Sequence, residues 1–567
     1  MPCLFNSFDP YFKQPFGAVR AGQSVHLSLC IPEELGYVDP HLVLQKEGRY
    51  DVPVHYRMKF DGQTPHQNHF SVDVTLNDVG LYFYYFDLYT DFRRIVRGPD
   101  NCGVVSWQEG ESWQITVYEA DFETPAPIKG KVFYQIFPDR FCEGVENKPM
   151  PFPDRLYQAD KHAEPFWQPN EVGGHLNEDY FGGDLKGIQM KLPYLRKMGV
   201  DYLYLNPIFE AHSNHRYNTA DYLNVDPLLG TNEDFVALCA EAKKYGIGIV
   251  LDGVFSHTGS DSRYFNREGR YGEGGVIDTW LRRGAAGFRL DVADELPDSF
   301  IEKVRTAVKR VSPDKFLLGE VWEDATTKFG FDKRRTYLLG KGLDSVMNYP
   351  FKNAVLGFVC GRDAGQTMTD ILTLCEHYPA PALDTALNFL STHDTERALT
   401  VIADEPANGR GRAWQSGRCV TGDAYEEGML RLRMAYAIIY TLPGVPCLYY
   451  GDEIGMQGYR DPFNRGFYCW DSHEERLRPV LAQLAQLRHS CEAFRTGALR
   501  VLRSEGGILH YQRIGEAETA EIIVNRTEHI IVEPLASGKH TEVNPMGFTI
   551  VVEEIGHNPD HSYYDYQ

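Results

Sequence analysis

The sequence predicts a multidomain protein in which a central (β/α)8 barrel, the TIM-barrel architecture, is flanked by N-terminal and C-terminal β-sandwich domains. Three observations support this fold class. The chain has 567 residues, whereas a single hydrophobic core stops growing near ~250–300 residues, so several domains are expected. Residues 1–122 and 495–567 contain short apolar runs separated by turn residues, and this spacing is typical of β-domains. Between them, predicted strands and helices alternate, which is typical of a barrel with parallel strands.

The first predicted domain, residues 1–122, consists of short β-strands. Runs such as SVHLSLCIP, HFSVDVTL and GLYFYYFDLY are rich in Val, Leu, Tyr and Phe, and turn residues such as Gly22 separate them. This pattern favours a small β-sandwich. The following segment, ETPAPIKGK, has two prolines, one glycine and no apolar period, which indicates a linker.

The second predicted domain, residues 131–490, contains eight apolar runs that alternate with helical periodicities. In the first helical segment, Leu185, Ile188 and Leu192 recur at helical spacing, and Pro193 is expected to kink or restart the helix. Eight strands are what a (β/α)8 barrel requires. A doubly wound sheet also alternates, but the sequence contains neither GxGxxG after the first strand nor GxxxxGKS. The eight runs are KVFYQIFPDRF, VDYLYLNPIF, IGIVLDGVFSH, GFRLDVADE, KFLLGEVW, DSVMNYP, ALNFLSTHD and GVPCLYYGDE.

The last predicted domain, residues 495–567, returns to short strands such as ILHYQRI, AEIIVNR and GFTIVVEE. A second small β-domain is therefore expected there.

Charge and cysteine usage exclude several classes of partner. The formal net charge is −22, so the surface repels phosphate backbones and anionic lipids, and neither nucleic acid nor a membrane is expected as a partner. No apolar run approaches the ~20 residues of a membrane span, and the first residues lack the features of a signal peptide. The 11 cysteines include no CxxC pair, so we expect reduced thiols in a cytoplasmic protein.

Four of the apolar runs end in charged or polar residues, namely LDGVFSH, GFRLDVADE, FLLGEVW and NFLSTHD. Strands of a parallel barrel are buried on both faces, and the residues that follow them reach the end of the barrel where catalysis occurs. Three carboxylates are placed in this way, those of Asp291, Glu320 and Asp394. Each alone could be a structural ion pair or a helix cap, but together in one barrel they indicate a catalytic site.

The neighbours of two of these acids predict different protonation states. Arg289 and Asp291 are two residues apart in a strand and point to the same face, and a guanidinium lowers the pKa of a carboxyl beside it. Glu320 follows the apolar run FLLG, where partial burial would raise its pKa. One ionised and one protonated carboxyl is the arrangement that glycoside hydrolysis uses. Asp394 could strengthen its contact with sugar hydroxyls as positive charge develops on the ring.

The four segments resemble, in the same order, the conserved regions of the α-amylase family of glycoside hydrolases (family 13). The resemblance implies that Asp291 is the nucleophile of a retaining reaction, Glu320 the acid/base and Asp394 the stabiliser of the transition state. It also implies residues that hold the sugar, in these segments and in HRYNTADY. The implied substrate-binding residues are Tyr217, His257, Arg289 and His393, and the implied structural residues at the site are Asp221 and Asp252.

Further stretches, among them YQIFPDRF, FGGDLKGI and LPGVPCLYYGDEIGM, are similar to the neopullulanase, cyclomaltodextrinase and maltogenic amylase branch of that family. Asp461 and Arg465 resemble a stretch near the mouth of the active site and are expected to bind substrate. Members of this branch frequently dimerise through an N-terminal β-domain. The resemblance therefore implies an α-glucan as substrate and a homodimer through residues 1–122. A carbohydrate-binding-module-like role for that domain stays open, although no exposed pair of Trp residues is apparent there.

The sequence departs from the family between His257 and Asp291, which are only 34 positions apart. The family usually has several tens more residues in this region, where they form a protruding domain. In this chain a Gly-rich stretch, GRYGEGG, takes that place. The domain B loop, residues 258–275, is either naturally short or lacks a segment in the recorded sequence.

We expect no cofactor and no metal. Ser256 stands where many relatives have Asn, and the loop CEGVENKP lacks the Asp/Asn-rich set that binds calcium in some relatives. Hard cations need about six or more oxygen ligands, to which Asp184 and Asn147 could contribute.

The leading hypothesis is a retaining hydrolase of α-1,4 bonds in pullulan, cyclodextrins or maltooligosaccharides. A pullulanase-type enzyme that cleaves α-1,6 branches is the alternative within the class, because both types use the same three carboxylates. A non-catalytic glucan-binding protein on the same barrel is the alternative of another class, since a fold alone does not determine function.

Overall fold

The computed structural model describes residues 3–48, 53–89, 92–146, 148, 150, 155–168, 177–256, 264 and 275–555, and the backbone of 562–565. The chain divides into two compact units. The first unit contains Met1–Thr124, Glu323–Asp344 and Met368–Leu383, and the second contains Pro125–Trp322, Ser345–Thr367 and Asp384–Gln567. Within the described part of the chain, every helix is too short or too polar to cross a membrane.

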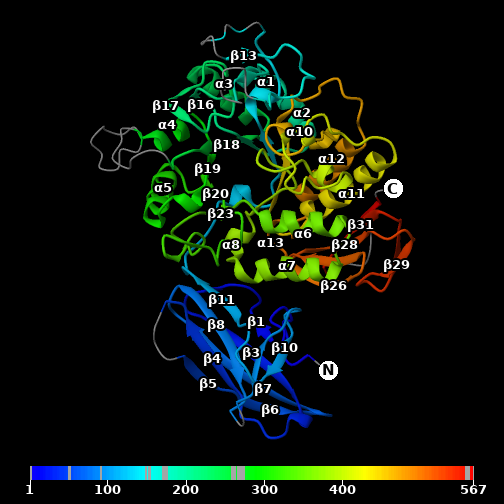
Figure 1. The fold of residues 1–567 in the computed structure, drawn as a ribbon. Coiled ribbons are helices and arrows are strands. Elements are labelled where there is room, and N and C mark those ends of the chain that lie inside the picture. The colour runs from blue at the N-terminus through cyan, green and yellow to red at the C-terminus, as the bar shows by residue number, and fades with distance from the viewer. Residues whose placement is uncertain are drawn as a thin grey trace. The chain divides into compact units, whose positions relative to one another are not determined.

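The N-terminal part of the first unit is a β-sandwich, coloured blue in Figure 1. Its strands are β1 Lys13–Gln14, β2 Val19–Arg20, β3 Gln23–Pro32, β4 His41–Lys46, β5 Val54–Arg57, β6 Lys59–Thr64, β7 Gln67–Leu76, β8 Gly80–Asp87, β9 Arg94–Arg97, β10 Gly103–Ser106 and β11 Trp113–Tyr118. One sheet has the order β1-β3-β7-β6, and the other has the order β10-β9-β8-β11-β2, with β4 and β5 attached through β8. Alternate residues of the strands, such as Leu27, Phe86 and Trp113, are buried in one shared core, as the alternation of a half-buried strand requires.

Two later stretches of the chain belong to the same unit as this sandwich. They contain the hairpin of β21 (Phe329–Gly330) and β22 (Lys333–Arg334), the second part of α7 (Ala364–His377), and α8 (Ala380–Leu383). Lys13 Nζ lies 2.7 Å from a carboxylate oxygen of Glu376, and both side chains are buried. Buried charges of this kind occur in pairs, so this ion pair ties the sandwich to the second part of α7.

The second unit is built on a sheet of eight parallel strands. They are β12 Phe133–Ile136, β15 Tyr202–Leu205, β18 Gly248–Gly253, β19 Gly287–Leu290, β20 Phe316–Gly319, β23 Ser345–Val346, β24 Leu387–Asn388 and β25 Val445–Tyr449. Their order is β23-β20-β19-β18-β15-β12-β25-β24, and a parallel bridge from Met347 to Leu387 links the two edge strands. These are the eight predicted strands, and the (β/α)8 barrel is confirmed.

Helices alternate with these strands along the chain (cyan to yellow in Figure 1). In α5, Ile301, Val304 and Val308 recur at helical spacing and are buried, which gives the helix one apolar face. The helical segment that contains Pro193 is divided in two, as predicted, because proline is tolerated only in the first turn of a helix. The helices of this unit are α1 Leu185–Met190, α2 Leu192–Lys197, α3 Asn232–Lys244, α4 Val276–Arg282, α5 Asp298–Val311, α6 Tyr349–Val359, α9 Ala398–Ala403, α10 Arg412–Gln415, α11 Asp423–Thr441, α12 Leu477–Ser490 and α13 Ala493–Thr496.

Close packing of β19 against β20 depends on a glycine. Gly287 pairs with Phe316, and a Cβ atom at Gly287 would lie 2.1 Å from the carbonyl oxygen of Phe316. Only glycine has no Cβ, so the close approach of the two strands requires it. The polar residues that follow the two strands are therefore held side by side.

The C-terminal strands, orange to red in Figure 1, belong to the second unit. They form a sheet of order β26-β27-β28-β31-β32 and the pair β29-β30. Two further pairs, β13-β14 and β16-β17, lie within loops of the barrel. The bounds are β13 Leu156–Tyr157, β14 Asp179–Tyr180, β16 Phe209–Ala211, β17 Thr219–Val225, β26 Ala498–Glu505, β27 Ile508–Ile514, β28 Glu518–Asn525, β29 Ile531–Pro534, β30 His540–Val543, β31 Gly547–Glu554 and β32 Ser562–Asp565.

Candidate functional site

The barrel brings three of the predicted acidic residues onto one guanidinium. Arg289 lies in β19 and is fully buried. Its Nη1 atom donates to Asp252 Oδ1 at 2.7 Å and to Asp291 Oδ1 at 2.8 Å, and its Nη2 atom lies 2.7 Å from Glu320 Oε2. The three carboxylates come from the ends of three neighbouring parallel strands, which is where barrel enzymes place their reacting groups.

The protonation of Asp291 differs from the expectation that Arg289 keeps it ionised. Burial raises the pKa of Asp291 from 3.8 to about 7, although the Arg289 guanidinium opposes this change. Burial also raises the pKa of Asp252. The guanidinium carries one positive charge and contacts three carboxylates, so its charge cannot balance all of them. Asp291 is therefore partly protonated near neutral pH, and it titrates together with Asp252.

The carboxylate of Glu320 is held from both sides. Its Oε2 atom accepts a hydrogen bond from the backbone nitrogen of Val292 at 2.9 Å, and its Oε1 atom accepts one from Trp322 Nε1 at 3.0 Å. Val292 has a φ of 42°, a conformation that costs a β-branched residue ~1–3 kcal/mol and is concentrated at functional sites. This backbone turn directly after Asp291 points an N–H group at Glu320. The two acids are thus linked through the main chain as well as through Arg289.

Tyr217 and His393 belong to a second network around Asp252. The Tyr217 hydroxyl donates to Asp252 Oδ2 at 2.7 Å and lies 2.5 Å from His393 Nε2. The two rings are nearly parallel, with 6° between their planes and 5.3 Å between their centroids. Gln135 Nε2 donates to His393 Nδ1 at 2.9 Å and to Asn206 Oδ1 at 3.0 Å, and Asn206 in turn donates to the Tyr217 hydroxyl.

These contacts assign the proton of His393. Because Nδ1 accepts from Gln135, the hydrogen of a neutral imidazole is on Nε2. Burial, together with Arg465 and Arg289, holds the pKa of His393 well below its usual value, so the ring is neutral. Its Nε2–H group faces the Tyr217 hydroxyl and, at 3.1 Å, Asp394 Oδ2.

Asp394 lies at the more exposed edge of this cluster. Its side chain is 31% exposed, and its Oδ1 atom lies 3.6 Å from Arg465 Nη2. Arg465 also contacts Asp461 Oδ1 at 2.9 Å and donates from Nε to the carbonyl oxygen of His393 at 3.0 Å. Burial raises the pKa of Asp394 to about 6, against the effect of Arg465. Arg465 therefore connects Asp461 and Asp394 to the backbone of His393.

One predicted site residue is placed differently, and another lies outside the described residues. The carboxylate of Asp221 accepts from the backbone of Leu223 and from the side chain of Asn224, both in its own strand β17, and these contacts do not include the Arg289 cluster. His257 and most of the loop 258–275 lie outside the described residues.

Sequence reasoning missed several residues of the two networks. Tyr204 donates to Asp252 Oδ2 at 2.7 Å, and Gln135, Asn206, Val292 and Trp322 make the contacts described above. The polar residue Gln135 within the apolar strand FYQI was a usable signal, because a polar side chain at a core position usually marks a site that needs it. No local pattern marks Val292, whose role depends on its backbone conformation.

The oxygens around Asp184 hold an ammonium group. Lys148 Nζ lies 2.5 Å from Asp184 Oδ2 and donates to the carbonyl oxygens of Gly182 at 2.6 Å and Leu228 at 3.2 Å. Three donors meet three acceptors, which matches the capacity of a lysine ammonium. Asn147, the other residue considered for calcium, lies outside the described residues. The described oxygens around Asp184 are therefore occupied by the Lys148 ammonium, which leaves them poorly suited to a calcium ion.

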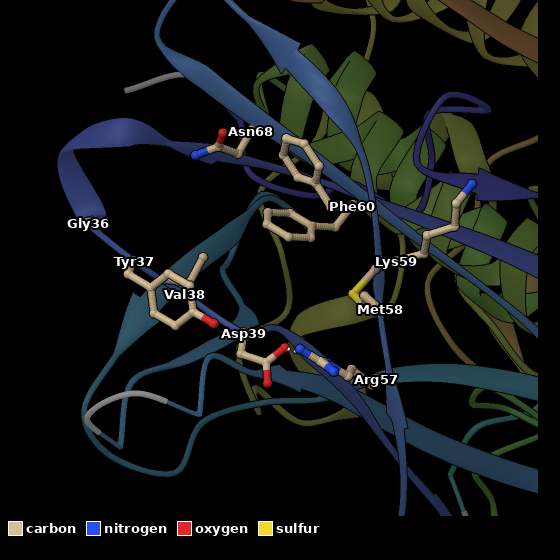
Figure 2. Close-up of a pocket in the computed structure, with 10 residues that line it drawn as sticks. Gly36, Tyr37, Val38, Asp39, Arg57, Met58, Lys59, Phe60 and Asn68 are labelled. Atoms are coloured by element: carbon tan, nitrogen blue, oxygen red, sulfur yellow. Dashed lines mark hydrogen bonds and ion pairs between the residues drawn. The ribbon is translucent and has the colours of Figure 1, made fainter.

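The N-terminal sandwich has a hollow of about 560 Å³ (Figure 2). Tyr37 and Phe60 line it and are 80% and 54% exposed, and beside them Arg57 donates to Asp39 at 2.8 Å. A second hollow of the same unit is lined by Trp107, which is 65% exposed, together with other aromatic side chains. Sequence reasoning did not identify Trp107 as exposed. Large exposed apolar side chains grouped in this way mark interaction surfaces.

Comparison with known proteins assigns the chain to a family. Residues 135–274 and 270–496 match the family model described as the alpha-amylase catalytic domain, and the two stretches overlap at residues 270–274. The cyclomaltodextrinase of Geobacillus thermopakistaniensis (strain MAS1) is 31% identical, over 73% of this chain and 72% of the relative. The solved cyclic α-maltosyl-(1→6)-maltose hydrolase from Arthrobacter globiformis is 29% identical, with a TM-score of 0.63 over 76% of this chain and 100% of that chain.

A longer relative matches more of the chain. The amylopullulanase of Thermoanaerobacter thermohydrosulfuricus is 29% identical over 90% of this chain but only 40% of its own length, so the chain spans less than half of that relative. The matched family model nevertheless covers more than half of the chain, and the barrel carries the acids at the ends of its strands. The chain belongs to the α-amylase family of glycoside hydrolases.

Proposed function

We propose that the protein hydrolyses α-glucans with retention of configuration at the anomeric carbon. The observation that carries this proposal is the set of three carboxylates around Arg289, with Asp394 at its edge. In the first step Glu320 protonates the glycosidic oxygen while Asp291 attacks the anomeric carbon, and the leaving sugar departs. In the second step Glu320 removes a proton from water while the water oxygen attacks the anomeric carbon, and the bond between that carbon and Asp291 breaks. Retaining enzymes hold two such carboxyls ~5–5.5 Å apart.

The contacts of the other residues suit binding of a neutral sugar. The ring of Tyr217 is partly exposed and offers a flat face, backed by the parallel ring of the buried His393. Asp394 with Arg465 offers an acceptor and a donor for hydroxyl groups. Asp394 is ionised above a pH of about 6. It can therefore stabilise the positive charge that develops on the ring in the transition state, which accelerates the reaction only if the contact strengthens there.

The bond that is cleaved is proposed to be the α-1,4 bond of pullulan, cyclodextrins or maltooligosaccharides. The relatives named cyclomaltodextrinase and neopullulanase support this choice. Product analysis on pullulan is the decisive test: panose or isopanose is expected. Maltotriose would instead indicate an α-1,6 debranching enzyme. Binding of pullulan without any hydrolysis product would favour a glucan-binding protein.

We expect kcat/KM to fall as the pH drops below about 7, because the pKa of Asp291 is raised to about 7 and its protonated form cannot attack. The pH profile of kcat/KM reports the free enzyme, so its acidic limb should lie near pH 7 rather than near 4. The free energy of unfolding is expected to change with pH in the opposite direction to kcat/KM. A raised carboxyl pKa stabilises the folded state below about pH 7 and destabilises it above that pH. A chromogenic maltooligosaccharide is a suitable substrate, and an acidic limb near pH 4 would contradict the assignment.

Activity and melting temperature are expected to be unchanged by EDTA, because Lys148 supplies the positive charge at Asp184. Lys148→Met should lower the melting temperature, since it leaves Asp184 and two carbonyl oxygens without their donor. Lys186→Met, at a neighbouring exposed lysine, is the control and should have little effect. Loss of activity or stability of the unaltered protein in EDTA would show that a metal is required.

We also propose that the protein self-associates through the N-terminal unit, using the aromatic side chains around Trp107 and Tyr37. Analytical ultracentrifugation should show a dimer that is weakened in the double variant Trp107→Ser/Tyr37→Ser. Affinity electrophoresis in a gel that contains pullulan tests whether Trp107 and Tyr37 bind glucan instead of a second copy of the chain. A monomer whose retardation in the gel depends on Trp107 and Tyr37 would overturn the proposal and assign the surface to a glucan.

A further inference from the structure

Two cysteine thiols of the N-terminal unit are in contact although they are far apart in sequence. Cys3 Sγ lies 3.0 Å from Cys102 Sγ, which is about 1 Å longer than the ~2.05 Å of a disulfide bond. Both side chains are partly exposed, so a small oxidant can reach them. Forming the bond requires a movement of about 1 Å between the two sulfur atoms.

The backbone on both sides of this contact is held in place. Asn6 forms an antiparallel bridge with Cys102, and Gly103 donates to the carbonyl oxygen of Phe5 at 2.7 Å. Phe5 is fully buried, with its ring centroid 4.7 Å from that of Trp113. The two cysteines therefore stay close because core packing and backbone hydrogen bonds position the segments that carry them.

We propose that Cys3 and Cys102 are a site of reversible disulfide formation, with a low-molecular-weight disulfide such as glutathione disulfide as the oxidant. Cys3 attacks a sulfur of glutathione disulfide, and one glutathione leaves as the thiolate. Cys102 then attacks the Cys3 sulfur of the mixed disulfide and displaces the second glutathione. The two protein thiols lose two protons and two electrons, and glutathione disulfide is reduced to two molecules of glutathione.

The order of attack follows from the surroundings of the two thiols. Burial and the contact with Cys3 raise the pKa of Cys102 to about 12, so Cys102 remains a thiol near neutral pH. The thiolate is the attacking species in exchange, which makes Cys3 the first nucleophile. Once Cys3 is part of the mixed disulfide it carries no charge and no longer raises the pKa of Cys102, so Cys102 can lose its proton and attack. The Cys3 sulfur is then the one already in contact with it.

The bond would close a loop that contains strands β1 to β9 of the N-terminal sandwich. Long loops restrict the unfolded chain most, and a chain terminus is otherwise a place where unfolding begins. The oxidised protein is therefore expected to have a higher melting temperature than the reduced protein, through stabilisation of the first unit.

The test uses the full chain, reduced, desalted and then equilibrated with glutathione disulfide. After alkylation and tryptic digestion, mass spectrometry should find the peptide 1–13 linked to the peptide 98–129. The link and the rise in melting temperature should both vanish in Cys3→Ser and in Cys102→Ser. Both should persist in Cys360→Ser, which removes an exposed thiol elsewhere.

Two results would overturn the proposal. One is a stable mixed disulfide with glutathione at Cys3 in the unaltered protein, without the linked peptides, because it would show that Cys102 does not resolve it. The other is a rise in melting temperature on oxidation that persists in Cys102→Ser, because it would come from a different pair of thiols.

Discussion

Asp291→Asn is expected to reduce the turnover of α-glucans by ~10⁴-fold or more, the size found when a covalent nucleophile is removed. An amide cannot attack the anomeric carbon, but it has nearly the shape of the carboxyl group. Its oxygen can still accept from Arg289 Nη1, which lies 2.8 Å from Asp291 Oδ1. Binding of maltooligosaccharides should therefore survive, and calorimetry on the inactive variant should detect it.

The same variant should be more stable than the unaltered protein at pH 8. Burial raises the pKa of Asp291 from 3.8 to about 7. A carboxyl whose folded pKa is raised contributes stability that is complete below its unfolded pKa and is lost as the pH rises through the folded pKa. At pH 8 the unaltered protein has lost this contribution, whereas the neutral amide never titrates. The gain in melting temperature should shrink toward pH 5.

Two measurements separate this explanation from general damage to the fold. Asp314→Asn, at an exposed position before β20, should change neither turnover nor the melting temperature. A slow substrate with a fluorinated ring and a good leaving group should trap the glycosyl-enzyme, and mass spectrometry should find the label on Asp291. A label on another carboxylate, or undiminished hydrolysis by Asp291→Asn, would contradict the assigned nucleophile.

Arg289→Met is expected to lower the free energy of unfolding of the barrel unit by ~3–5 kcal/mol at pH 8, the cost of leaving buried charges without their partner. Arg289 is fully buried and contacts the carboxylates of Asp252, Asp291 and Glu320. Without the guanidinium these groups remain buried and repel one another. Activity should also be lost, because nothing then holds Asp291 and Glu320 in position.

The destabilisation by Arg289→Met should be smaller at pH 5 than at pH 8. The carboxyls of Asp252 and Asp291, whose pKa values burial raises, take up protons as the pH falls, and neutral carboxyls no longer need a cation. Urea denaturation at the two pH values measures the difference. Arg57→Met removes the guanidinium of an exposed pair with Asp39, also at 2.8 Å, and should have little effect at either pH. Equal losses for the two variants would show that burial does not decide the outcome.

The fold could be predicted well because its signals are local. The eight barrel strands are apolar runs followed by polar residues, and each run is a strand in the structure. The restart of the helix at Pro193 is equally local, since proline affects the turn in which it stands. The assignment of 323–344 and 368–383 to the same unit as the sandwich has no local signal. It depends on contacts such as that between Lys13 and Glu376.

The candidate site shows the same division. The positions of Asp291, Glu320 and Asp394 after three strands could be read from the chain, and so could their shared end of the barrel. The protonation state of Asp291 could not be predicted from the sequence. Its neighbour Arg289 suggested a lowered pKa, but burial and two further carboxylates on the same guanidinium raise it instead. Burial and the sharing of one cation are properties of the packed molecule.

The sequence by itself determined the barrel, the order of its strands along the chain and the acids that follow them, because hydrophobic period and residue order act over a few residues. Only the tertiary structure decided three contacts. Arg289 binds three carboxylates, the Tyr217 ring stacks beside the His393 ring, and the Lys148 ammonium binds the oxygens around Asp184. Apart from the contact between Arg289 and Asp291, each of these contacts joins residues tens or hundreds of positions apart. Their distances and burial arise only when the strands close into the barrel and exclude water.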